Sequence, residues 1–95
     1  MNAAILGYGT VGGGVYEILK DRPDISVKYV LDKALVAELG AISVTDFSAI
    51  LNDAEVDTVV EVMGGLEPAY EYITAAMRAG KNIVTANKQL LAARY

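Results

Sequence analysis

The 95-residue chain has the length of a single domain, and its composition excludes several classes of protein. Its 12 acidic and 8 basic residues give a net charge of −4 without a basic run, which argues against nucleic-acid binding. The absence of cysteine and histidine excludes a disulfide framework and argues against a metal site of the zinc type. We find no signal-peptide pattern and no run of the ~20 apolar residues that a membrane span needs, so we expect a cytoplasmic protein without a membrane partner.

The first predicted strand leads into a glycine-rich turn. Residues 3–6 are apolar, and residues 7–12, Gly-Tyr-Gly-Thr-Val-Gly, fit the G-x-G-x-x-G pattern of dinucleotide-binding turns. Helical spacing follows, with apolar residues on one face: Val11, Val15, Ile18 and Leu19. We therefore expect the glycines at a strand-to-helix turn, which is the context that this motif requires.

Each glycine of the motif has its own physical role in such a turn. Gly7 lets the chain leave the strand sharply, Gly9 lets a diphosphate lie against bare backbone, and Gly12 lets the helix pack close to the strand. Unpaired N–H groups and the positive end of the helix dipole then face the phosphates. Thr10 offers a hydroxyl as helix cap or phosphate donor, and we also expect Val11, the next residue of this turn, to contact the cofactor. The alternative is a glycine-rich turn that binds nothing.

The second predicted strand ends at an acidic residue with the spacing of a ribose ligand. Residues 25–31 are rich in β-branched and aromatic side chains, and Asp32 follows them, 20 residues after Gly12. A carboxylate at this point accepts hydrogen bonds from the ribose hydroxyls and repels a 2′-phosphate, which favours NAD. Lys33 is able to meet a 2′-phosphate, so NADP stays open. The alternative role for Asp32 is the cap of a following helix.

Helices and strands are expected to alternate along the rest of the chain. The expected elements are a helix over 34–40 ended by Gly40, a strand over 42–45, a helix capped by Asp46, a strand over 57–63, a helix from Pro68 to Gly80, a strand over 82–86 and a helix over 88–94. In the helix after Asp46, we expect three residues to face inward: Phe47, Ile50 and Leu51. Around the helix from Pro68 to Gly80, we expect four residues in the core: Leu66, Tyr70, Ile73 and Met77. Glu61 interrupts the apolar run of its strand and needs a partner or a solvent-facing end.

This alternation predicts an α/β fold. We expect a Rossmann-type doubly wound parallel sheet of about five strands in the order 3-2-1-4-5, with helices on both faces. The 54% share of hydrophobic residues fits a sheet that is covered on both sides. One dinucleotide-binding domain is expected over residues 1–95, with no sequence for a sixth strand. The strand over 82–86 would then be an open edge, so we expect a homo-oligomer.

A second pair of glycines, Gly64 and Gly65, follows the strand over 57–63. Ligands of open α/β sheets bind at the carboxyl ends of the strands, where this pair is expected to lie. The pair is either a second glycine loop near the diphosphate or the nicotinamide, or a flexible strand-to-helix turn.

The second half of the chain closely resembles the homoserine dehydrogenase family. Residues 64–69, Gly-Gly-Leu-Glu-Pro-Ala, and residues 84–88, Val-Thr-Ala-Asn-Lys, carry the likeness, which extends from Ala3 to Ala92. The resemblance implies an NAD(P)-dependent oxidoreductase that interconverts L-homoserine and L-aspartate 4-semialdehyde, on the route to threonine and methionine. It also implies that four residues border the nicotinamide half of the cofactor, namely Gly64, Gly65, Thr85 and Ala86.

Lys88 matches a lysine that members of this family place near the reacting oxygen. Such a lysine is a proton shuttle if burial lowers its pKa, and a fixed charge otherwise. The alternative is a solvated lysine in the first turn of a helix.

This chain departs from the family in length. Family members are several times longer and carry a second domain for the amino-acid substrate and the dimer contact, and residues 33–43 are shorter here than the family pattern. We therefore expect a chain that binds dinucleotide without turning over homoserine. The alternatives are a stand-alone nucleotide-sensing module and a folded fragment that binds nothing.

Overall fold

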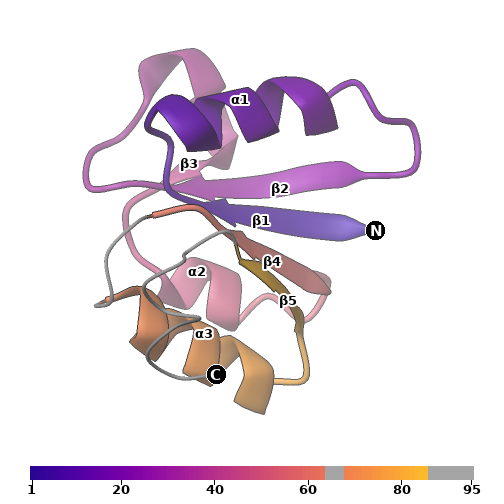
Figure 1. Ribbon diagram of the computed structural model, residues 1–95, viewed down its shortest axis with the longest axis vertical. Helices are drawn as coiled ribbons and strands as arrows, with labels where there is room; N and C mark the ends of the chain where they lie inside the picture. Colours follow the sequence, from indigo (N-terminus) through magenta and orange to yellow (C-terminus); the bar gives the residue numbers. More distant parts are fainter. Residues whose placement is uncertain (64–67, 86–95) are drawn as a thin grey trace.

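The computed structural model describes residues 1–63 and 68–85 (Figure 1). Its elements in chain order are β1 (Asn2–Leu6), α1 (Thr10–Leu19), β2 (Ser26–Leu31), the 3₁₀ helix η1 (Ala37–Ile42), β3 (Ser43–Val44), α2 (Ser48–Leu51), β4 (Thr58–Glu61), α3 (Ala69–Arg78) and β5 (Asn82–Thr85). The five strands form one parallel sheet in the order β3-β2-β1-β4-β5. The predicted fold class and strand order are confirmed.

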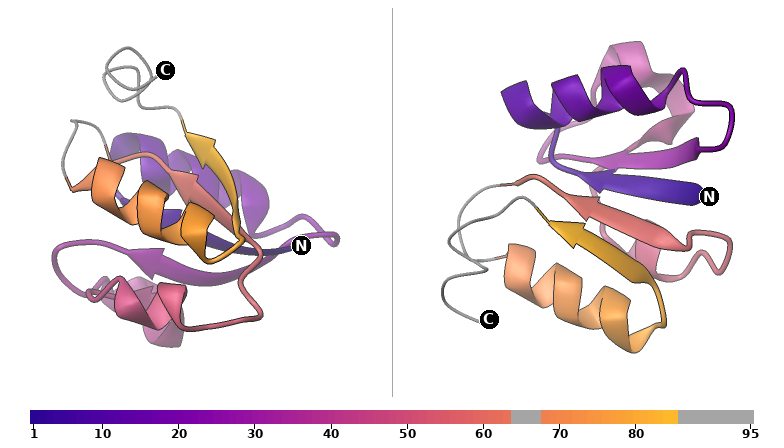
Figure 2. Two further views of the ribbon diagram at one scale, coloured as in Figure 1. Left: turned by 90° about the horizontal axis from the view of Figure 1, so that it is seen from below. Right: turned by 45° about the vertical axis from the view of Figure 1, so that its right-hand side comes forward.

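Helices cover both faces of this sheet. Figures 1 and 2 show α1 and η1 on one face and α2 and α3 on the other. The chain builds β1, β2 and β3 toward one side and then returns to place β4 on the other side of β1. The strand order therefore reverses beside β1, and the crevice at such a switch point is where open α/β sheets bind ligands.

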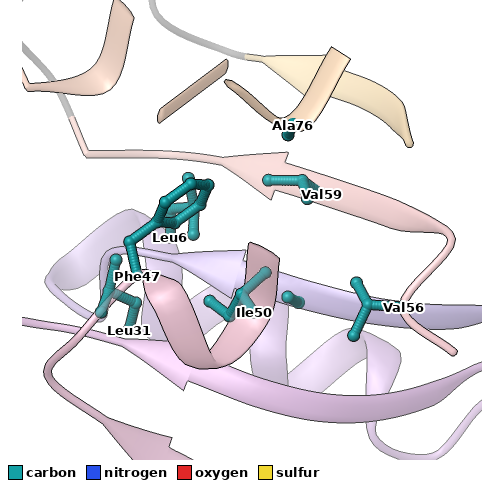
Figure 3. Packing of buried hydrophobic residues seen from close by; sticks show 8 residues of the cluster. Leu6, Leu31, Phe47, Ile50, Val56, Val59 and Ala76 are labelled. Atoms are coloured by element: carbon teal, nitrogen blue, oxygen red, sulfur yellow. The ribbon is translucent and has the colours of Figure 1, made fainter. Parts of the chain in front are cut away.

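The main hydrophobic core lies between the sheet and the α2–α3 layer (Figure 3). Phe47 stacks on Tyr72 of α3, with ring centroids 4.4 Å apart, and Ile50 is completely buried beneath it. The predicted inward orientation of Phe47 and Ile50 is confirmed, and Leu51 is partly buried against the same cluster. This core joins α2 and α3 to one face of the sheet.

A β-bulge in β2 brings two side chains to the amino edge of the sheet, where the strands begin. Ala3 pairs with Val27 and Ala4 with Tyr29, which leaves Lys28 as the extra residue. Lys28 and Tyr29 both reach the loop before β4 as a result: the ammonium lies 3.2 Å from Asp53, and the tyrosine hydroxyl donates to the same carboxylate at 2.8 Å.

The inward faces of α1 and α3 agree only in part with the predicted ones: Ile73 is buried as predicted, and Val15, Leu19 and Tyr70 are partly buried. In α1, Val11 is 59% and Ile18 67% exposed, while Gly12 is buried against the sheet. In α3 the buried residues are Ala69, Ile73 and Ala76, whereas Met77 is exposed. Small residues, Gly12 in α1 and Ala69 and Ala76 in α3, therefore occupy much of the buried side of these helices, where they allow close packing.

The connection between β2 and β3 also differs from the prediction. In place of a helix over 34–40, the 3₁₀ helix η1 begins at Ala37 and continues to Ile42, with a kink at Gly40 (φ +63°). Asp32 does not cap it, because the residue at its N-cap is Val36.

The start of α2 differs from the prediction, whereas the end of α3 agrees with it. The N-cap of α2 is Phe47 and not Asp46, although the Asp46 carboxylate accepts the N–H of Ser48 at 2.9 Å. Gly80 (φ +83°) ends α3, and the N–H groups of Gly80 and Lys81 donate to two carbonyls of its last turn, each at 3.0 Å. The expected helix over 88–94 and Leu66 lie outside the described residues.

Candidate functional site

A cleft of about 640 Å³ opens at the carboxyl edge of the sheet, at the switch point beside β1. Six residues that the sequence singles out line it: Gly7, Gly9, Thr10, Val11, Asp32 and Lys33. Seven further lining residues were not predicted: Tyr8, Leu31, Thr45, Val62, Met63, Pro68 and Tyr72. Five of these seven lie at the ends of the strands or within two residues after them: Leu31 ends β2, and Tyr8, Thr45, Val62 and Met63 follow β1, β3 and β4. The ends of the strands were therefore the signal that could have identified them.

The glycines of the first turn meet different surroundings. Gly7 has φ +104°, and a Cβ there would lie 3.2 Å from the backbone of Met63. A Cβ on Gly12 would collide with the carbonyl oxygen of Gly7. A Cβ on Gly9, in contrast, would meet no atom within 4 Å, and its φ of −69° is open to any residue. The fold therefore requires glycine at positions 7 and 12, whereas the packing does not require it at position 9, where the backbone borders the open space of the cleft.

The amino end of α1 faces this cleft. The helix begins at Thr10 with Gly9 as its N-cap, and its first turn has neither a side-chain cap nor an acidic residue. The cap role predicted for Thr10 is therefore wrong, because Thr10 already belongs to the helix; its role as a phosphate donor stays a prediction. The first N–H groups of a helix have no partner within it, so they are available to an anion in the cleft.

Asp32 lines the cleft directly after β2. One of its carboxylate oxygens accepts the N–H of Lys33 at 2.7 Å, and its own N–H donates to the carbonyl of Val44 at 3.2 Å. These contacts hold the acid in the lining of the cleft with Lys33 beside it. The arrangement is suited to a ribose diol, and it leaves both NAD and NADP open.

Glu61 ends β4 with its side chain completely buried. Its two carboxylate oxygens accept hydrogen bonds from the N–H of Met63 at 2.6 Å and from the hydroxyl of Thr85 at 2.5 Å. These hydrogen bonds are the partners that the sequence requires for a glutamate within an apolar strand. Thr85 contacts Glu61, and neither Thr85 nor Gly12 lines the cleft.

The other predicted site residues, Gly64, Gly65, Ala86 and Lys88, lie outside the described residues. Within residues 1–63 and 68–85, no three acidic side chains gather in a way that could hold a metal ion. No helix in that part of the chain is long and apolar enough to cross a membrane.

The fold and the cleft together define a dinucleotide-binding domain of the doubly wound class. Residues 7–95 match the family model described as homoserine dehydrogenase, NAD binding domain, and the chain belongs to this family.

Curated relatives and solved structures agree with this assignment. The chain is 40% identical to a homoserine dehydrogenase of Lactococcus lactis and 45% identical to one of Synechocystis, over 97% and 96% of its length. The structure of a homoserine dehydrogenase from Thiobacillus denitrificans superimposes with a TM-score of 0.86 at 37% identity, over 98% of this chain and 25% of that one.

The relatives are longer than this chain in two respects. The chain spans about a quarter of their length, 25% for the Lactococcus protein and 24% for the Synechocystis protein. The alignment with the Lactococcus protein covers 108 positions, more than the 95 residues of this chain, so that protein also has additional residues inside the matched region.

Proposed function

We propose that this chain is the cofactor-binding part of a homoserine dehydrogenase and that it holds NAD or NADP across the cleft beside β1. The observation that carries the proposal is the bare backbone at Gly9. The fold tolerates a side chain there, and the cleft has room for a diphosphate there.

The cleft suggests how the dinucleotide lies. Asp32 receives the hydroxyls of the adenosine ribose, and the N–H groups at the start of α1 receive the diphosphate. The nicotinamide then lies at the remaining end, beside Val62 and Met63 after β4. Gly64 and Gly65 follow Met63 in sequence, and Thr85 pairs with Glu61 across β4 and β5, with Ala86 next along the chain. We assign these four residues to the nicotinamide half.

The reaction that we propose for the whole enzyme is hydride transfer between the nicotinamide and L-homoserine or L-aspartate 4-semialdehyde. Hydride leaves the carbinol carbon as a proton leaves its oxygen, and we assign that proton to Lys88. The amino-acid substrate needs a second domain, so the 95 residues are one cofactor domain that does not turn over homoserine alone. We also propose that the protein is cytoplasmic and homo-oligomeric, without a nucleic-acid or membrane partner.

The proposal is tested by calorimetric titration of the chain with NAD and with NADP, in the wild type and in Gly9→Ala. We expect saturable binding by the wild type and a loss of roughly tenfold or more in the variant, because the new methyl group occupies the place of the diphosphate. The stability of the variant should stay within about 0.5 kcal/mol of the wild type.

Gly13→Ala is the matched control. It adds the same methyl group to a glycine that also has open space around it but does not line the cleft, so binding should be retained. Equal affinity in wild type and Gly9→Ala would contradict the proposed place of the diphosphate. A folded wild type that binds neither nucleotide would contradict cofactor binding by this chain.

A further inference from the structure

Glu61 is a fully buried acid beside the cleft, and the binding mode proposed above does not use it. It directly precedes Val62 and Met63, which form the β4 end of the cleft. The other buried residue with an ionisable side chain in the described part of the chain, Lys81, lies at the opposite edge of the sheet, where its ammonium donates to the carbonyls of Asp53 and Val56.

Each oxygen of the Glu61 carboxyl group accepts one hydrogen bond. The hydroxyl of Thr85 donates at 2.5 Å and the N–H of Met63 at 2.6 Å, one to each oxygen. Distances of about 2.5–2.7 Å are typical of O–H···O⁻ hydrogen bonds, which are stronger than neutral ones. Both oxygens act as acceptors, as they do in a carboxylate.

The ion pairs found within residues 1–63 and 68–85 do not include Glu61. A buried charge is unfavourable unless a charge of opposite sign and hydrogen bonds compensate it. The two hydrogen bonds supply part of this compensation. A positive group in the adjacent cleft would supply more.

The oxidised dinucleotide brings such a group, because its nicotinamide ring is positively charged, whereas the ring of the reduced form is neutral. We infer that the buried carboxylate of Glu61 makes this cleft prefer the oxidised cofactor to the reduced one. This inference rests on the proposed function, since it needs the nicotinamide at the β4 end of the cleft.

The size of the preference depends on how far apart the two charges are and on what surrounds them. In general, two unit charges about 10 Å apart at an effective dielectric constant of about 20 attract by an energy that corresponds to roughly fifteenfold in affinity. Solvent and salt at the open cleft reduce this value. We therefore expect Glu61 to contribute roughly three- to tenfold to the preference for the oxidised form.

The test compares wild type and Glu61→Gln by titration with the oxidised and reduced forms of NAD or NADP, whichever binds more tightly. Glutamine has the same shape, accepts the N–H of Met63 and donates to the hydroxyl of Thr85, so the fold should be kept. The ratio of the two dissociation constants should shift by roughly three- to tenfold against the oxidised form.

Asp32→Asn is the control at the adenosine end, where the two forms of the cofactor are identical. It should change both affinities by the same factor. An unchanged ratio in a folded Glu61→Gln chain would overturn the inference and leave the proposed function standing. A wild type that binds neither form would overturn both.

Glu61→Asp provides a second measurement, which does not depend on the folding of Glu61→Gln. It shortens the side chain and so disturbs the hydrogen bonds to Met63 and Thr85, but it keeps the charge, so the preference of the wild type should persist. A shift against the oxidised form equal to the one expected for Glu61→Gln would mean that local packing, and not charge, sets the ratio. That result would overturn the inference.

Discussion

Gly12 and Gly13 are neighbours in α1, yet a side chain at each would meet different surroundings. A Cβ on Gly12 points into the carbonyl of Gly7, and a Cβ on Gly13 points into open space. Comparing the two positions separates two effects of glycine: at Gly12 it allows close packing against the turn, and at any position of a helix it lowers the stability of the helix. It also explains why α1 lies close enough to β1 for its amino end to face the cleft.

We expect Gly12→Ala to lower the free energy of unfolding by about 1–3 kcal/mol, because the helix must move away from the turn. Gly13→Ala should raise it by up to about 1 kcal/mol, since alanine is the better helix former. Urea denaturation followed by circular dichroism measures both. Equal stability of the two variants would contradict the close packing at Gly12.

A residue of the candidate site could be predicted where its distance along the chain from the glycine motif was sufficient to identify it. Asp32 was predicted from its distance to the glycine motif and lines the cleft. Val62 and Met63 were missed as lining residues, because the apolar run over 57–63 gives no sign of where the strand ends. The partners of Glu61 were not predictable, because Thr85 meets it through the pairing of β4 with β5, 24 residues along the chain.

At the scale of elements, one extra residue in β2 links the sheet to the loop before β4. The bulge at Lys28 lets this side chain and Tyr29 meet Asp53, and Lys28 also donates to Glu55 at 2.6 Å. Hydrogen bonds from the Tyr29 hydroxyl, from the N–H of Glu55 and from Lys28 lower the pKa of the Asp53 carboxyl. The link is therefore strongest while Asp53 is ionised.

This link predicts a dependence of stability on pH. Because the pKa of Asp53 is lower in the folded chain, its carboxylate stabilises the fold above its unfolded pKa of about 4, and this contribution is lost as the pH falls through the folded pKa. Asp53→Asn should reduce stability at neutral pH and make the loss of stability in acid less steep. Urea denaturation at neutral and acid pH measures this.

Tyr29→Phe tests the main cause of the pKa change at Asp53. It removes only the hydroxyl that donates to the carboxylate, so it should weaken the pH dependence in part. Parallel stability curves for the wild type and both variants would show that Asp53 does not link β2 to the loop.

The helix faces illustrate where periodicity is ambiguous. α1 contains three glycines and α3 three alanines, and some of these small residues share the buried side with larger ones, so the spacing of the large apolar residues predicted the inward faces only in part. In α3 the buried stripe consists of Ala69, Ile73 and Ala76, which have the helical spacing of three and four residues. The distance between helix and sheet decides between the two faces, and that distance is a tertiary property.

At the scale of the whole molecule, β5 forms one edge of the sheet in the described part of the chain. Val84 on this edge is 56% exposed. An exposed edge strand with an apolar side chain is a template for pairing with another chain.

We expect the 95-residue chain to self-associate at high concentration and expect Val84→Lys to weaken this association, because lysine on an edge strand opposes pairing. Ile18→Lys is the matched control: it places the same charge on an exposed apolar position of α1, outside the edge. Sedimentation of the wild type and both variants measures the effect. A monomeric wild type at high concentration would contradict the prediction.

The sequence by itself determined the class of fold, the strand order, the glycine turn and the acid after β2. These features depend on local rules, namely alternation of elements, handedness of crossovers and fixed spacing within one βαβ unit. Only the tertiary structure decided which helix faces are buried, which residues complete the cleft and which groups meet Glu61. These depend on contacts between distant segments, where side-chain volume, register and helix-to-sheet distance act together.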